Sequence, residues 1–319
     1  MSESKQENSL TLSDNEVDLR ELFSLLWAGK WLIGGISFTA AMIAVAVAFS
    51  LPNIYRAEAL LAPNDPQGTG GLSALAAQYG GLASLAGINL NSGSADKTAL
   101  GLAVLKSRKF VAGFIERHDI LVPLMAVEDW DAESGELKID PRVYDLATDR
   151  WVRDARPPRK ATPSLQEAHK VFMEILSVSQ DKKSGFVSIA VEHYSPTVAK
   201  QWVDWLVGDV NFSIMQQDVA EAEQAIAYLN EQIESTSLAD LQNVFFKLIE
   251  EQTKIVMLAK VSPEYMLRTL DPAVIPEIQS RPNRVLICVL GTLLGGMLSM
   301  IWVLIRHYAF RTAEDAQFG

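Results

Sequence analysis

The hydrophobic positions of this 319-residue chain are concentrated in two uninterrupted stretches near its ends, residues 31–51 and 285–305. Neither stretch contains a charged side chain. At ~1.5 Å per residue each would form a helix about 30 Å long, which matches the hydrocarbon core of a bilayer. Buried helices of soluble proteins are usually shorter or keep a polar face. The pattern therefore predicts two transmembrane helices around a polar central segment, with both termini on one side of the membrane.

The residues that flank the two stretches are typical of membrane interfaces, where aromatic rings and long cationic side chains reach the headgroups. Two cations, Arg20 and Lys30, precede the first stretch and one, Arg56, follows it closely. This bias favours cytoplasmic termini. The first stretch begins about 30 residues into the chain and is longer than the apolar core of a signal peptide, so we expect an uncleaved anchor.

Small residues recur at every fourth position within both stretches. They are Ala40, Ala44 and Ala48 in the first and Gly291, Gly295 and Ser299 in the second. Such ridges let helix backbones approach closely, and van der Waals contact then drives association in lipid. We expect the two spans to pack on each other or on a neighbouring subunit. The alternative is that Ala and Gly are simply common in membrane helices.

The central segment mixes the periodicities of strands and helices, which predicts an α+β domain. Extended or alternating runs predict strands at residues 54–62, 186–193 and 265–270, with a further candidate at 150–153. Apolar residues at helical spacing predict helices at residues 98–118 and 165–176. Ser164 and Glu167 have the spacing of a capping box for the second helix.

One predicted helix is much longer than the others. It begins at Thr197 and continues to Ser235, and about 39 residues at ~1.5 Å each correspond to ~58 Å. Its far half carries an apolar seam at Val219, Ala222, Ile226, Leu229 and Ile233. A second helix, capped by Ser237, should run to about Ala259 with its own apolar stripe at Leu241, Val244, Phe245, Leu248, Ile255 and Leu258. We therefore expect a protruding helical hairpin, with Ile226 and Leu229 as candidate packing residues.

Net charge, cysteine count and the lack of known motifs exclude several classes of function. The net charge of −11 argues against a nucleic-acid partner. The single cysteine, Cys288, lies in the second stretch and excludes an internal disulfide. The four histidines are scattered, and no phosphate-binding loop or zinc motif is present. We therefore expect no catalytic residues, no cofactor and no metal.

One acidic cluster has part of the spacing of a calcium-binding loop. Asp129, Asp131, Glu133 and Asp140 match positions 1, 3, 5 and 12 of such a loop. Ser134 stands where the loop needs Gly, and an aspartate replaces the bidentate glutamate. A solvated loop between strands is the better interpretation.

A basic run offers the strongest candidate for ligand contact. Arg153, Arg156, Arg159 and Lys160 follow Trp151 and could contact an anionic glycan or a lipid-linked phosphate. The competing interpretation, which we prefer, is a charged surface strand and turn in which the acids Asp149 and Asp154 pair with their neighbours.

Several segments together resemble a known family. The first span, the strand IYRAEALLAP, one very long helix, a proline-rich return and the span sequence RPNRVLICVLGTLLGG occur in this order. In order and spacing the chain resembles the polysaccharide co-polymerases, specifically the O-antigen chain-length determinants of the Wzz type. The resemblance implies a Gram-negative inner-membrane protein, a membrane-proximal α/β base, a helical hairpin trunk and a homo-oligomeric ring. It also implies a non-enzymatic role beside a membrane O-antigen polymerase, with lipid-linked glycan as a candidate contact.

These expectations define a domain plan. Residues 1–30 and 306–319 are cytoplasmic tails, residues 31–51 and 285–305 are spans, and residues 52–284 are periplasmic. The base comprises residues 52–196 and 261–284, and the hairpin comprises residues 197–260.

Two alternatives stay open at this stage. The Gly-, Ala- and Leu-rich segment 68–90 resembles loops of exopolysaccharide co-polymerases, so an exopolysaccharide or capsule role is possible on sequence grounds. A two-span periplasmic sensor is the other alternative, although the expected tails are short for an output domain or a fused kinase.

Overall fold

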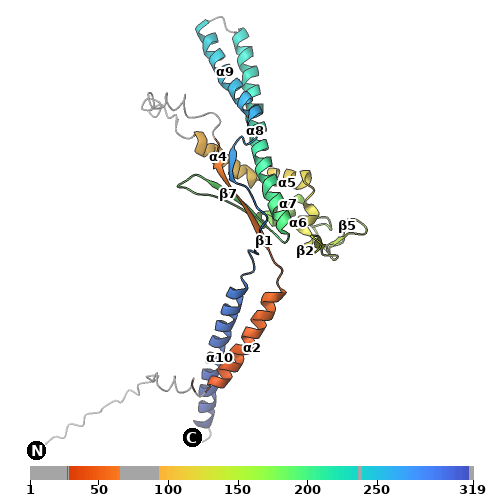
Figure 1. Ribbon diagram of the computed structural model, residues 1–319, viewed down its shortest axis with the longest axis vertical. Coiled ribbons are helices and arrows are strands. Elements are labelled where there is room, and N and C mark those ends of the chain that lie inside the picture. Colours follow the sequence, from red (N-terminus) through yellow and green to blue (C-terminus); the bar gives the residue numbers. More distant parts are fainter. Residues whose placement is uncertain (1–26, 28, 65–92, 236–238, 316–319) are drawn as a thin grey trace, which may run out of the picture. The chain divides into compact units, whose positions relative to one another are not determined.

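The computed structural model describes residues 27, 29–64, 93–235 and 239–315. The chain forms two compact units (Figure 1). One unit combines Met1–Leu51 with Pro282–Gly319, and the other is the continuous segment Pro52–Arg281. The expected segment 68–90 and the expected cap Ser237 lie outside the described residues.

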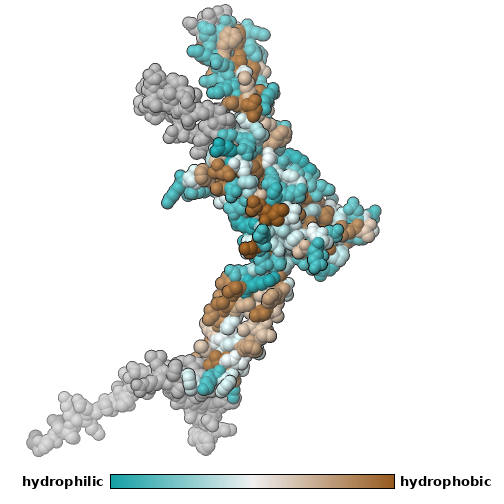
Figure 2. Space-filling model, in the orientation of Figure 1, coloured by the Kyte–Doolittle hydropathy of each residue, from teal (hydrophilic) through white to brown (hydrophobic). Residues whose placement is uncertain are grey.

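The first unit is a pair of apolar helices, α2 (Lys30–Ser50) and α10 (Arg284–Asp315), which lie side by side. Both are long and apolar enough to cross a membrane, over Lys30–Ser50 and Arg284–Arg306. In each span only 11% of the most apolar window is buried, so these are not core helices of a soluble domain. Apolar side chains cover the outer surface of this pair, whereas polar residues dominate the surface of the other unit (Figure 2).

The second helix of this pair is longer than the expected span. It continues past Arg306 to Asp315, into the segment expected to be a plain tail. Residues 306–315 contain neither Gly nor Pro, so nothing interrupts the i to i−4 hydrogen bonds of the helix.

The central unit is built on a four-stranded antiparallel sheet with the order β6-β7-β1-β8. Its strands are β1 (Tyr55–Pro63), β6 (Leu176–Gln180), β7 (Val187–His193) and β8 (Leu267–Asp271). In β1 the side chains of Ala57, Ala59 and Leu61 are buried at two-residue spacing. The central strand β7 is buried along almost its whole length. The prediction of β1, β7 and β8 is confirmed, whereas the polar edge strand β6 was missed.

Four short helices and two small hairpins lie between β1 and β6 in the described part of the chain. The segment expected to be one helix over residues 98–118 is two helices, α4 (Gly93–Leu105) and α5 (Arg108–Arg117). The prediction was wrong because Ser107 adopts an extended backbone and its hydroxyl accepts a hydrogen bond from the Phe110 amide at 3.2 Å, which starts a new helix. Between them and the following helix lie α6 (Leu121–Met125), β2 (Val127–Trp130), β3 (Leu137–Ile139), β4 (Tyr144–Asp145) and β5 (Arg150–Trp151).

Helix α7 (Leu165–Ile175) has half of its expected capping box. The Ser164 hydroxyl accepts a hydrogen bond from the Glu167 amide at 3.2 Å, as predicted. The Glu167 carboxylate instead accepts a hydrogen bond from Arg153 at 2.7 Å.

The longest helix, α8 (Pro196–Ser235), belongs to both the core and the hairpin. Its first half packs on β1 and β7 through buried residues that include Trp202, Leu206 and Ile214. Its second half packs on α9 (Ala239–Val261), and the Gln242 side chain donates a hydrogen bond to the Ile233 carbonyl at 3.4 Å near the tip. The predicted hairpin of two long helices is confirmed.

The orientation of α9 differs from the predicted stripe. Phe245, Ile255 and Leu258 are half-buried as expected, but Leu241, Val244 and Leu248 are exposed. The covered face also includes Gln242, Ile249, Gln252, Val256 and Ala259. The prediction assigned residues of both faces to one stripe, whereas α9 carries two adjacent apolar faces and α8 covers only one of them.

Candidate functional site

The small-residue ridges of the two spans face each other. A Cβ atom built on Gly291 would lie 2.5 Å from the Cβ of Ala44, and one built on Gly295 would overlap Ala40. Ala48 and Ser299 are fully buried. Because the glycines have no side chain, the backbones approach closely at these positions. The structure thus places all six ridge residues at or beside one helix contact, and their part in contacts between subunits stays a prediction.

Polar side chains within the spans bond to their own helices. The hydroxyls of Thr39, Ser50, Thr292 and Ser299 each donate to a backbone carbonyl three or four residues earlier. This arrangement satisfies a hydroxyl in lipid without a partner helix. Near the ends, the Arg284 guanidinium lies 4.9 Å from the Phe49 ring centre and Lys30 lies 4.8 Å from that of Trp27. These cation–π contacts suit the interface on each side.

Asn211 joins the core to the last strand. Its side-chain oxygen accepts hydrogen bonds from the amides of Met266 and Leu267, both at 2.8 Å. Its amide nitrogen donates to the carbonyls of Val207 and Leu267 at 3.1 and 3.0 Å. The side chain is 2% exposed and uses all its hydrogen-bonding capacity. A helical asparagine among apolar residues was the available sequence signal, but its partners Met266 and Leu267 lie over 50 residues away and were not predictable.

A second polar contact supports the same junction. The Tyr265 hydroxyl donates to Asp218 at 2.8 Å, and burial together with this carboxylate raises the pKa of the tyrosine. The two contacts hold the chain between α9 and β8 against α8.

The rings of His118 and His193 contact side chains and backbone groups within the central unit. The ring of His193 accepts a hydrogen bond from the Ser195 amide through Nδ1 at 3.0 Å, so Nε2 carries the proton and donates to the Pro123 carbonyl at 3.2 Å. Burial lowers the pKa of His193 from 6.5 to about 4, and the ring stays neutral near pH 7. His118 stacks on Trp205 with ring centres 4.2 Å apart and contacts Asp209 at 3.0 Å.

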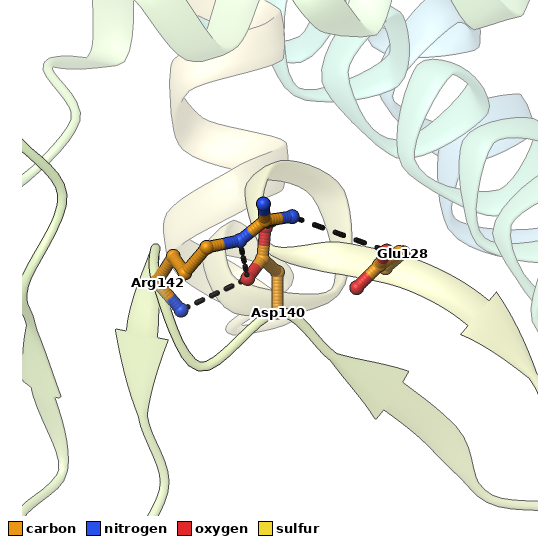
Figure 3. A network of polar contacts seen from close by, with 3 residues as sticks. All are labelled: Glu128, Asp140 and Arg142. Carbon is orange, nitrogen blue, oxygen red and sulfur yellow. Dashed lines mark hydrogen bonds and ion pairs between the residues drawn. The ribbon is translucent and has the colours of Figure 1, made fainter.

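The acidic side chains of the cluster form ion pairs and hydrogen bonds with residues of their own loops and strands. Asp140 pairs with Arg142 at 3.0 Å, and the same guanidinium reaches Glu128 at 4.0 Å (Figure 3). This hydrogen bond lowers the pKa of Asp140. Asp131 accepts from the Glu133 amide at 3.0 Å, and Gly135, not Ser134, takes the positive φ of 74°. Within the described residues no group of three or more potential ligands could hold a metal ion.

The basic run separates into one structural and three exposed cations. Arg153 donates to the carbonyls of Ala161 and Lys160 at 2.7 and 2.9 Å and pairs with Glu167 at 2.7 Å. Arg156, Arg159 and Lys160 are exposed. The expected local pairing through Asp149 is not what the structure shows, because its carboxylate accepts a hydrogen bond from the Tyr144 hydroxyl.

Comparison with known families assigns the chain. The model of the chain length determinant protein family, Wzz, matches residues 15–117. Residues 15–117 therefore carry a Wzz chain length determinant domain, which supports the Wzz-type family predicted from the sequence. A second model, described as a G-rich domain on putative tyrosine kinase, matches residues 239–308. The family members are chain-length regulators, and the two spans fit a protein of the inner membrane.

Two solved structures of polysaccharide co-polymerases are distantly similar to this chain. A full-length bacterial polysaccharide co-polymerase is 14% identical, with 92% of this chain and 99% of that one covered and a TM-score of 0.39. A fragment of WzzB, a polysaccharide co-polymerase from Salmonella Typhimurium, is 12% identical, with 72% and 100% covered and a TM-score of 0.32. None of the curated proteins compared with the chain matches it by sequence. The family assignment rests on the sequence models, because TM-scores this low do not establish a common arrangement of the whole chain.

Proposed function

We propose that the chain is a non-enzymatic, homo-oligomeric regulator of the length of lipopolysaccharide O-antigen. In this proposal Pro52–Arg281 lies in the periplasm of a Gram-negative bacterium and both termini are cytoplasmic. The observation that carries the proposal is the Wzz match over residues 15–117, which includes the first span and β1. The oligomer would engage a membrane polymerase or the growing lipid-linked glycan and bias termination.

The hairpin supplies the surface for assembly in this proposal. Leu241, Val244 and Leu248 are 44%, 50% and 40% exposed on one face of α9, and they recur at three- and four-residue spacing. This is the spacing of a seam for another helix. The equivalent hairpin of a second copy is a suitable partner because it carries the same seam.

An exopolysaccharide or capsule co-polymerase is the second candidate. The match of residues 239–308 to a domain found on putative tyrosine kinases supports it, as does the Gly-, Ala- and Leu-rich composition of segment 68–90. Deletion of the gene followed by lipopolysaccharide gels and sizing of secreted polysaccharide separates the two. Loss of modal O-antigen length with polymer still made supports the first proposal. A normal O-antigen ladder with altered secreted polymer contradicts it and supports the second.

Charged substitutions in the hairpin test the scaffold mechanism. Ile226→Glu or Leu229→Glu places a carboxylate in the seam between α8 and α9, and Val244→Glu places one on the outer face of α9. We expect all three to broaden the O-antigen length distribution on a gel. In Val244→Glu the hairpin should stay folded while the oligomer dissociates, which size measurement in detergent reports.

Ala227→Glu is the matched control, because Ala227 is exposed on α8 beside the seam. It should leave the ladder unchanged. An unchanged ladder for the Ile226 and Leu229 variants at normal protein levels would refute the scaffold mechanism.

A further inference from the structure

The chain between β8 and the second span presents an unusual surface. We call residues 272–281 the return segment. Val274, Ile275 and Ile278 in this segment are 68%, 53% and 83% exposed. Ile278 is the most exposed large apolar side chain among the described residues of Pro52–Arg281.

This exposure does not come from a loose chain. At one end Ala273 is buried, and at the other the backbone of Ile54 exchanges hydrogen bonds with Ser280 and Arg281 at 2.8 to 3.2 Å. Arg281 also pairs with the buried carboxylate of Glu192 at 3.4 Å. Pro272 and Pro276 restrict the backbone between these anchors. The segment is therefore fixed at both ends with its apolar side chains directed outward.

Chain length limits how far this segment can lie from the ends of the two spans. Ile278 precedes Arg284, the first residue of α10, by six residues, and six extended residues reach about 20 Å at most. Ile54, which is hydrogen-bonded to the return segment, follows Ser50, the last residue of α2, by four residues, a reach of about 14 Å at most. Two short tethers thus restrain the same segment relative to the two spans.

We propose that Val274, Ile275 and Ile278 insert into the interfacial layer of the membrane that the spans cross. Shallow insertion of apolar side chains to ~5–10 Å is typical of interfacial segments. The acidic side chain of Glu277 is exposed next to them and would stay among the headgroups, which limits the depth. Arg281 and Arg284 place cations at the level of the lipid phosphates. The return segment thereby contacts the lipid surface and anchors the central unit to it.

The occupant of this surface is lipid in our proposal, and a second copy is the competing occupant. The outer face of α9 offers helical spacing that matches another helix, whereas the return segment has no regular secondary structure and contains two prolines. An irregular, proline-rich apolar surface offers no seam for a copy of itself. A fluid lipid layer needs no complementary shape.

Fluorescence of the full chain in vesicles of phosphatidylethanolamine and phosphatidylglycerol tests the proposal. Cys288→Ala removes the only cysteine, and Ile278→Cys then carries an environment-sensitive fluorophore. We expect blue-shifted emission and quenching that is stronger with lipids brominated near the headgroup than with lipids brominated near the chain ends. Val274→Cys, labelled in the same way, should respond similarly.

Leu146→Cys is the control, since Leu146 is 67% exposed in the turn between β4 and β5. It should show water-like emission and no quenching. Water-like emission at both Ile278 and Val274 would overturn the proposal. Blue-shifted emission without quenching by brominated lipid would also overturn it and would indicate a protein partner. The result depends only on membrane insertion of the spans, so it stands or falls independently of O-antigen regulation.

Discussion

At the scale of single residues, buried polar side chains connect secondary-structure elements of the central unit, and all their hydrogen bonds are satisfied. Asn211 connects α8 to β8, and His193 connects the end of β7 to α6. Each is nearly inaccessible to solvent. Such groups stabilise one arrangement of the elements, because any other arrangement leaves buried donors or acceptors without partners.

Replacing Asn211 by Ala should be strongly destabilising. The amides of Met266 and Leu267 would lose their acceptor, and an unsatisfied buried group costs ~1–3 kcal/mol. We expect a loss of about 3 kcal/mol in the free energy of unfolding, measured by urea denaturation of the full chain in detergent with tryptophan fluorescence. Asn230→Ala on the exposed face of the same helix should change it by less than ~0.5 kcal/mol. Equal effects of the two variants would contradict the assigned role.

His193 should make the stability depend on pH in a defined window. Its folded pKa of about 4 lies below its ordinary value of 6.5, so between these values the unfolded chain binds a proton that the folded chain does not. Stability is fully present above pH 6.5 and declines as the pH falls toward 4. The difference of 2.5 pH units corresponds to on the order of 3 kcal/mol.

Urea denaturation between pH 7 and pH 4 measures this decline. His193→Gln keeps a side-chain donor for the Pro123 carbonyl but does not titrate, so its stability should vary less over this range. The carboxylates of Asp140 and Asp181 have lowered pKa values and titrate below the window. A slope that is the same in the variant would show that His193 is not responsible.

At the scale of elements, the two spans associate through the close fit of their small side chains. Gly291 and Gly295 face Ala44 and Ala40, and the hydroxyls of Thr39, Ser50, Thr292 and Ser299 are satisfied within their own helices. Lipid and protein interior are similarly apolar, so close contact between backbones supplies the attraction. The arrangement therefore depends on the absence of side chains at these two glycines.

Gly295→Ile should separate the spans. The new side chain would overlap Ala40 and the backbone near Ser37, and overpacking of this kind costs ~1–3 kcal/mol. We expect the full chain to unfold at lower SDS fractions in mixed micelles. Gly34→Ile introduces the same side chain where no atom lies within 4 Å, and it should behave as the unmodified chain does. If the two variants unfold alike, the glycine contact does not stabilise the pair.

At the scale of the whole molecule, the single helix α8 joins the two parts of the central unit, the sheet core and the helical hairpin. Residues of α8 up to Ile214 belong to the core against the sheet, and residues from Ala222 onward pair with α9. Because α8 is one continuous helix, no loop separates its core half from its hairpin half. The hairpin is therefore held in a fixed direction relative to the sheet. This fixed hairpin is the feature that suits the proposed scaffold.

The features that the sequence by itself determined are those with a local cause. Two apolar stretches predicted the spans, because length and composition decide membrane crossing. Helical periodicity predicted α8 and α9, alternation predicted β7, and Ser164 predicted the start of α7. The order of motifs predicted the family.

Only the tertiary structure decided the features that depend on distant partners. β6 is a strand because β7 lies beside it, and the exposed side of α9 follows from which face α8 covers. Arg153, although counted as a candidate ligand contact, is bonded to Glu167. Asn211 is a structural residue because β8 returns to it from later in the chain. Local patterns specify which faces are apolar or polar, but the partner of each face is set by long-range packing.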